Sequence, residues 1–198
     1  MNILICGDSY AADWSKKYSV TGWPNMLAQT YNVTNVAQAG CCIFKIYNQI
    51  ANQNLENFDA IIINHTSPNR IYVRDHPVHS NDTLHKDSSL IYTDLVEHSK
   101  NFPELESIVN FYEKYFDLDY AKFIYNLIEE KIDQITANHK KVLHTSHIKR
   151  KDLYKFNNFY NFSVLNKKKF AGLANHYNLK GNSHIYKIIN EWLTVDHN

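Results

Sequence analysis

Two short runs of consecutive apolar residues constrain the fold of this chain more than any other feature. Ile3-Leu4-Ile5 and Ile61-Ile62-Ile63 are continuous rather than alternating. Such runs are typical of parallel strands that are covered on both faces. We therefore expect strands over residues 3–6 and 59–63, and two further apolar runs predict strands over residues 31–36 and 141–145.

Segments with helical periodicity lie between and after these runs. They span residues 23–29, 43–55, 105–136 and 183–193, and Asp117-Leu118-Asp119 is expected to divide the third segment into two helices. Alternating strands and helices predict a three-layer α/β/α sandwich around a central parallel sheet, as in flavodoxin-like folds. Right-handed crossovers then place the carboxyl ends of the strands at one edge of the sheet. We expect the chemistry there, in the loops that follow Cys6, Val36, Ile63 and Thr145.

Length and charge narrow the classes of function. The 198 residues are expected to form one domain, with a polar loop and a helical insertion at about 76–136. With 21 basic and 20 acidic side chains, the chain has no electrostatic reason to bind nucleic acid or an anionic membrane. No apolar stretch approaches the about 18 residues that a membrane span needs. Three cysteines, two of them adjacent, suit a reducing compartment, and no secretory signal precedes them, so we expect a cytoplasmic protein.

Three sequence elements carry candidate chemistry. Gly7-Asp8-Ser9 directly follows the first predicted strand, and a serine at such a turn presents its hydroxyl at the sheet edge. A helix cap is the competing interpretation, because Asp and Ser both cap well. Gly40 follows the second strand and allows its N–H to approach a bound group, although a simple turn explains it equally well. His176 precedes the last predicted helix, and it can serve as a general base or be an ordinary surface histidine.

The order of these elements resembles the SGNH (GDSL-like) hydrolase superfamily. The resemblance implies that Ser9 is the nucleophile and one oxyanion donor, that Gly40 supplies a second N–H to the oxyanion, and that His176 is the base. The sequence Gly181-Asn182 after His176 also fits the last block of that family. The resemblance covers nearly the whole chain in the order of its elements, but only about 20 residues as motifs.

Two blocks depart from the family pattern. The family places an Asp three residues before the His, and this chain has Leu173 there. A backbone carbonyl or an Asp from elsewhere can then orient the imidazole. The family also ends its third strand with an Asn that completes the oxyanion hole. By position Ser67 takes that place here, with Asn64 and Asn69 as other donors. Arg70, just beyond, either binds substrate together with Asn69 or pairs with an acidic residue.

The resemblance implies a serine esterase that hydrolyses an ester through a Ser-His acyl-enzyme mechanism. The expected substrate is a small-molecule or carbohydrate ester, such as an O-acetyl sugar, and no cofactor is expected. Two alternatives stay open. The same residues can pass the acyl group to a sugar hydroxyl, or the altered blocks can mark a non-catalytic binding domain. The sequence does not indicate an oligomeric state.

Other polar residues favour weaker interpretations. His76, His79 and His85 lie in the polar loop without an associated carboxylate or cysteine pattern, so no metal site is predicted. Cys41 and Cys42 follow Gly40, where small residues are ordinary packing choices. His144 and His147 flank the end of the fourth strand and can line the pocket, with no better claim than His176 to be the base.

Overall fold

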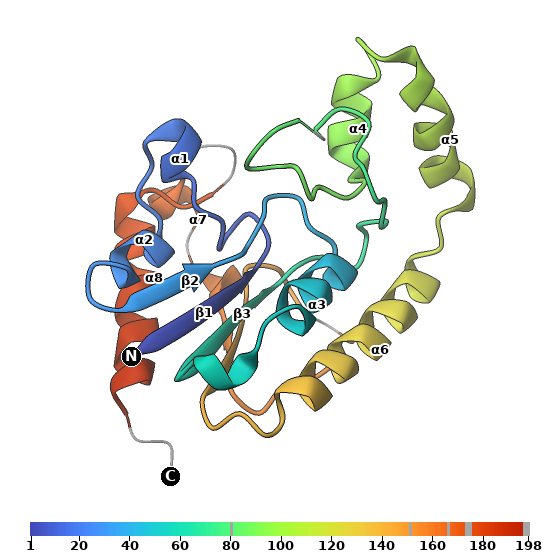
Figure 1. Ribbon diagram of the computed structural model, residues 1–198. Helices are drawn as coiled ribbons and strands as arrows, with labels where there is room; N and C mark the ends of the chain where they lie inside the picture. The colour runs from blue at the N-terminus through green and yellow to red at the C-terminus, as the bar shows by residue number, and fades with distance from the viewer. Residues whose placement is uncertain (80, 151, 166, 173–175, 196–198) are drawn as a thin grey trace.

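The chain folds around one parallel five-stranded sheet. The computed structural model describes residues 1–79, 81–150, 152–165, 167–172 and 176–195. The strands are β1 (Asn2–Gly7), β2 (Asn32–Asn35), β3 (Ala60–His65), β4 (Val142–Ser146) and β5 (Phe159–Asn161). Their order is β2-β1-β3-β4-β5, and every neighbouring pair is parallel (Figure 1). The four predicted strands are confirmed, and β5 was not predicted from the sequence.

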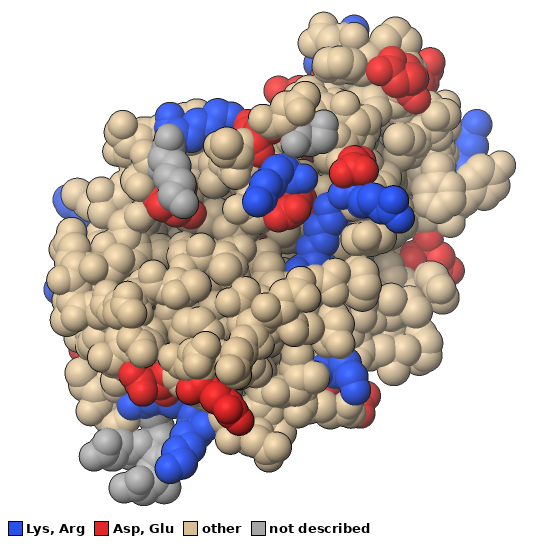
Figure 2. Space-filling view, viewed as in Figure 1, with Lys and Arg blue, Asp and Glu red and all other residues tan. Residues whose placement is uncertain are grey.

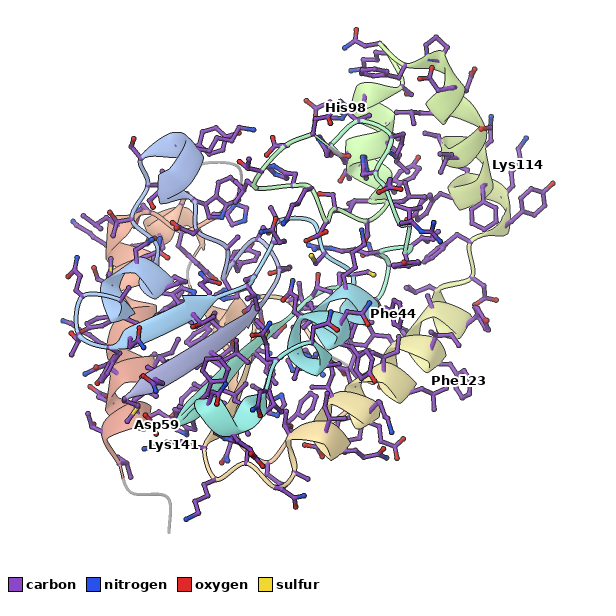
Figure 3. The ribbon with its side chains drawn as sticks, in the orientation of Figure 1. Phe44, Asp59, His98, Lys114, Phe123 and Lys141 are labelled. Carbon is purple, nitrogen blue, oxygen red and sulfur yellow. The ribbon has the colours of Figure 1, made fainter. Side chains whose placement is uncertain are left out.

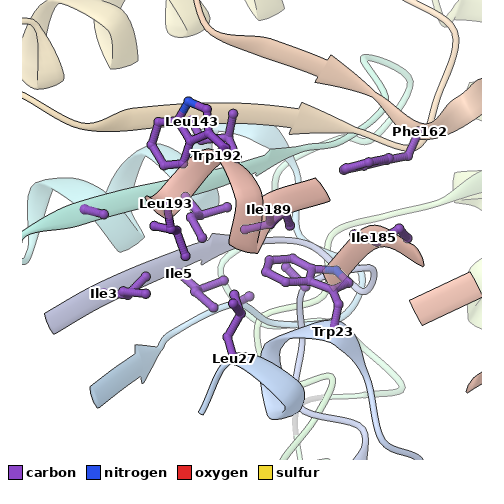
Figure 4. Close-up of a cluster of buried hydrophobic side chains, with 14 of the residues drawn as sticks. Ile3, Ile5, Trp23, Leu27, Leu143, Phe162, Ile185, Ile189, Trp192 and Leu193 are labelled. Carbon is purple, nitrogen blue, oxygen red and sulfur yellow. The ribbon is translucent and has the colours of Figure 1, made fainter. Parts of the chain in front are cut away.

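One face of the sheet is covered by α2 (Trp23–Leu27) and α8 (Leu179–Thr194). Side chains of Ile3 and Ile5 point from β1 into this layer, where they meet Trp23, Ile185 and Ile189 (Figure 4). All five are at most 1% exposed. Burying an Ile side chain contributes about 1.5–3 kcal/mol, so this layer is a main source of stability.

The opposite face is covered by α3 (Ile43–Ala51) and α6 (Leu118–Thr136). The alternate residues Leu4 and Cys6 of β1 point to this side and pack with Ile46, Ile50 and Ile132. The side chains on the two faces of β1 thus belong to two separate hydrophobic clusters, as the continuous apolar run predicts. The three-layer α/β/α architecture is confirmed.

The chain between β3 and β4 adds helices that stand apart from the sheet. After η1 (Leu55–Asn57) and β3 come α4 (Tyr92–His98), η2 (Pro103–Leu105) and α5 (Glu106–Tyr115), with α4 and α5 at the upper right of Figure 1. They pack on a cluster of their own around Leu95 and Tyr112. The predicted break between α5 and α6 is confirmed, because the Asp117 side chain accepts hydrogen bonds from the N–H groups of Asp119 and Tyr120 and caps α6.

The remaining elements are short. They are α1 (Ser15–Tyr18), η3 (Phe162–Val164) and α7 (Lys167–Phe170). On the face shown in Figure 2, basic and acidic side chains are interspersed rather than gathered by sign. Among the described residues, no helix has both the length and the apolar character that crossing a bilayer requires.

Candidate active site

Ser9 lies in a tight turn that directly follows β1. The N–H groups of Ala11 and Ala12 both donate to the Asp8 carbonyl, at 3.0 and 3.1 Å. The Asp8 side chain accepts from the Tyr10 N–H at 3.1 Å, and the indole N–H of Trp14 donates to the Ser9 carbonyl at 2.6 Å. Asp8 therefore supplies the side-chain hydrogen bond that stabilises this turn, which leaves the Ser9 hydroxyl for another role.

Asp8 is buried and ties the turn to the neighbouring strands. Its Oδ1 accepts from Asn64 Nδ2 at 2.7 Å, and its Oδ2 lies 3.1 Å from Arg70 Nη2. Asn64 in turn accepts from Thr145 Oγ1 at 3.0 Å. A buried carboxylate with an arginine and an amide donor is well compensated, because each partner replaces water that was lost on burial. The ends of β1, β3 and β4 are thus held in one hydrogen-bonded group.

Arg70 belongs to this group through both of its terminal nitrogens. Besides its ion pair with Asp8, it donates from Nη1 to the Cys41 carbonyl at 2.8 Å. Of the two roles considered from the sequence, the structure shows the acidic pairing. Asn64 is likewise occupied, by Asp8 and Thr145.

Gly40 lies in a loop that only glycine fits. Its φ is +78°, in the left-handed region that other residues rarely adopt, and an added Cβ would lie 2.2 Å from Ser88 Oγ. The loop is fixed from residues 84–89, since Ser88 Oγ donates to the Ala39 carbonyl at 3.1 Å and the Ser89 N–H donates to the Gly40 carbonyl at 3.0 Å. Within the described part of the chain, neither the Gly40 nor the Ser9 N–H donates to a backbone carbonyl.

His176 reaches the same place from the far end of the sequence. Its ring lies between the rings of Tyr10 and Trp14, with a centroid distance of 4.6 Å to each. Ser9, Gly40, Arg70 and His176 line one cavity of about 490 Å³. Ser9 and His176, which are far apart in the sequence, therefore line the same cavity at the carboxyl edge of the sheet, together with Gly40.

Two residues considered from the sequence lie elsewhere. Neither Ser67 nor Asn69 is among the residues that line this cavity. The Asn69 carbonyl instead accepts from the Tyr112 hydroxyl at 3.3 Å. The chain leaves β3 in a direction that brings Arg70, not Ser67, to the cavity. Leu173, the position of the missing acidic residue, lies outside the described residues.

His144 belongs to a buried network between the sheet and α6 and does not line this cavity. His65 Nδ1 lies 2.8 Å from Glu129 Oε1, and His65 Nε2 lies 2.9 Å from His144 Nδ1. Arg150 forms two hydrogen bonds with the Glu129 carboxylate, at 2.7 and 2.6 Å. Burial lowers the pKa of both histidines, so they are neutral at pH 7. Burial raises the pKa of Glu129, but His65 and Arg150 outweigh this and hold it below its ordinary value.

The polar loop, residues 76–89, is less exposed than the sequence predicts. Among its described residues it forms no helix or strand, as expected, but His76, Ser88 and Ser89 are buried. Its residues His79 and His85 line the same cavity as Ser9, together with Asp94 of α4. Asp94 was missed in the sequence because it lies 15 residues beyond His79, on a helix that was not predicted.

Comparisons with known proteins add little to this geometry. No family model matches the chain, and no curated protein matches it. Among solved structures, a catalytic mutant of Axe2, an acetylxylan esterase from Geobacillus stearothermophilus, superimposes with a TM-score of 0.42 at 11% identity. The match covers 98% of this chain and 94% of that chain. A likeness at this level carries no argument about activity.

Proposed function

We propose that this protein is a serine ester hydrolase in which Ser9 is the nucleophile and His176 the general base. The observation that carries the proposal is that Ser9 and His176 line one cavity, which Gly40 also lines. A hydroxyl, an imidazole and backbone donors in one concave site are what acyl transfer through a covalent intermediate requires.

The reaction follows from these positions. His176 accepts the Ser9 hydroxyl proton while Oγ bonds to the ester carbonyl carbon, and the carbonyl oxygen becomes an oxyanion that the Ser9 and Gly40 N–H groups stabilise. His176 then donates that proton to the leaving alcohol as the C–O bond breaks. A water molecule, deprotonated by His176, attacks the acyl-enzyme and releases the acid and Ser9.

Arg70 takes the place that the sequence suggested for Ser67. Its guanidinium lines the cavity and its side chain is 13% exposed, so it adds positive charge near the developing oxyanion. The ion pair with Asp8 reduces that charge and fixes the guanidinium in position. A cavity of about 490 Å³ suits a small ester, including an acetylated sugar.

The test is turnover of a short-chain aryl ester together with labelling by a fluorophosphonate probe. Ser9→Ala should lower kcat on the order of 10⁴-fold or more and abolish labelling. Ser107→Ala, on the exposed side of α5, is the matched control and should keep both. Equal activity of Ser9→Ala and the unmodified chain would refute the assignment. Adding a sugar acceptor and analysing the products distinguishes hydrolysis from acyl transfer to a hydroxyl.

A further inference from the structure

A second group of polar side chains lies beside the Ser9 cavity, where the polar loop meets α4. It consists of His76 and His79 from the loop and Asp94 from the first turn of α4. Figure 3 labels His98, which follows Asp94 by one turn on the same helix. Its Nδ1 donates to the Asp94 carbonyl at 2.9 Å. The sequence separates the histidines from Asp94, and the fold brings them together.

The donor atoms of this group have the spacing of a metal coordination sphere. His79 Nε2 lies 3.1 Å from Asp94 Oδ1, and His76 Nε2 lies 3.5 Å from Asp94 Oδ2. One donor atom from each of the three residues can be chosen so that all lie within 4.8 Å of one another. In a tetrahedral site with bonds of about 2.0–2.1 Å, neighbouring ligand atoms are about 3.3 Å apart. The two separations between a histidine and Asp94 are close to this value.

His76 gives an independent reason to expect a ligand at this position. Its side chain is 0% exposed, and within the described residues its Nε2 is buried without a hydrogen-bond partner. The N–H groups of Val78 and His79 point at its Nδ1, at 3.2 and 3.3 Å, and fix the ring with Nε2 toward Asp94. A buried polar atom without a partner is costly, and an ion at this point would provide one.

We propose that His76, His79 and Asp94 bind a divalent transition-metal ion of the zinc class. Two imidazoles and one carboxylate favour Zn²⁺ or Co²⁺ over Ca²⁺ and Mg²⁺, which prefer oxygen ligands. Because Nδ1 of His76 is a hydrogen-bond acceptor, the neutral ring carries its proton on Nε2. The bound ion takes the place of that proton, which is released to solvent.

His79 and Asp94 both line the Ser9 cavity, so an ion held between them would lie at the wall of that cavity. A catalytic type of zinc site has three protein ligands and one open position. The ion would therefore be accessible to a small ligand in the cavity, within reach of a polar group of whatever binds beside Ser9. The binding site itself does not depend on the proposed esterase activity.

The test uses the full chain, freed of metal with a chelator, and titrated with ZnCl₂ in a calorimeter. We expect saturable binding of one ion per chain, and Co²⁺ in its place should give the visible absorption of a tetrahedral site. Asp94→Asn preserves the shape of the side chain and should weaken binding by about 100-fold. His184→Gln, on α8, where the His184 ring stacks on Phe170, is the matched control and should bind as the unmodified chain does.

The possible results of the titration either support the metal site or overturn it. Absence of saturable Zn²⁺ binding by the folded chain would overturn the proposal, as would unchanged affinity in both Asp94→Asn and His79→Gln. Circular dichroism of each metal-free variant establishes that it is folded, so that lost binding reflects a lost ligand. Because binding is measured without ester turnover, an inactive Ser9 site and an absent metal site are distinguishable results.

Discussion

Gly40 is where the fold and the proposed chemistry depend most directly on one residue. Gly40→Ala adds a methyl group at a φ of +78°, 2.2 Å from Ser88 Oγ and 2.9 Å from Ser88 Cβ. A non-glycine residue in this conformation costs about 1–3 kcal/mol. Forcing a carbon into a packed site costs about another 1–3 kcal/mol. We therefore expect the free energy of unfolding to fall by about 2–6 kcal/mol, a large part of the about 5–15 kcal/mol typical of a domain.

The measurement is urea unfolding of the unmodified chain, Gly40→Ala, Ser88→Ala and the double variant. Ser88→Ala removes the nearest clashing atom, although it also removes the 3.1 Å hydrogen bond to the Ala39 carbonyl. The double variant should therefore be more stable than the two single effects predict together, by about 1 kcal/mol or more. The φ strain persists, so recovery should be incomplete.

Activity provides the second measurement on the same variants. If the Gly40 N–H stabilises the oxyanion, its displacement should lower kcat by about 10²–10³-fold, even in molecules that remain folded. An unfolding free energy of Gly40→Ala within about 0.5 kcal/mol of the unmodified chain would refute the reasoning about φ and Ser88. Unchanged turnover would refute the assignment of the Gly40 N–H.

The buried network on β3 and α6 leads to two further predictions. Glu129→Gln leaves the buried Arg150 charge without its carboxylate and should lower the free energy of unfolding by about 3–5 kcal/mol in urea titrations, and a loss below about 1 kcal/mol would contradict this. His65 and His144 have a lower pKa in the folded than in the unfolded chain, so the unfolded chain binds more protons in acid. Stability should be full above about pH 6.5 and fall as the pH is lowered below it, and equal urea midpoints at about pH 7.5 and about pH 5 would contradict this.

An exposed ion pair on the same helix provides the control for Glu129→Gln. Lys122 Nζ lies 3.3 Å from Asp119 Oδ1, and the Asp119 side chain is 93% exposed. Water and salt screen such a pair, so Asp119→Asn should change the free energy of unfolding by less than about 0.5 kcal/mol. A similar loss in both variants would mean that the burial of Glu129 is not the cause.

The sequence determined the architecture because its cause is local. Continuous apolar runs such as Ile61-Ile62-Ile63 must be covered on both faces, and periodic segments between them supply the cover. Asp117 marks the start of α6 because its side chain accepts hydrogen bonds from the N–H groups of Asp119 and Tyr120. The strand β5 was not predicted, because it has only three residues and none of them is buried. Helix α4 was not predicted either, since the helical segment predicted from the sequence begins at residue 105.

The tertiary structure alone decided which polar groups meet. The sequence left open whether Gly7-Asp8-Ser9 is a cap or carries a nucleophile. In the structure Asp8 is buried beside Asn64 and Arg70 and belongs to the scaffold. The tertiary structure also brings Arg70 rather than Ser67 to the cavity. It places Asp94 beside histidines that are 15 and more residues away in the sequence. Such meetings depend on the path of whole loops and helices through space, which periodicity and spacing along the chain do not specify.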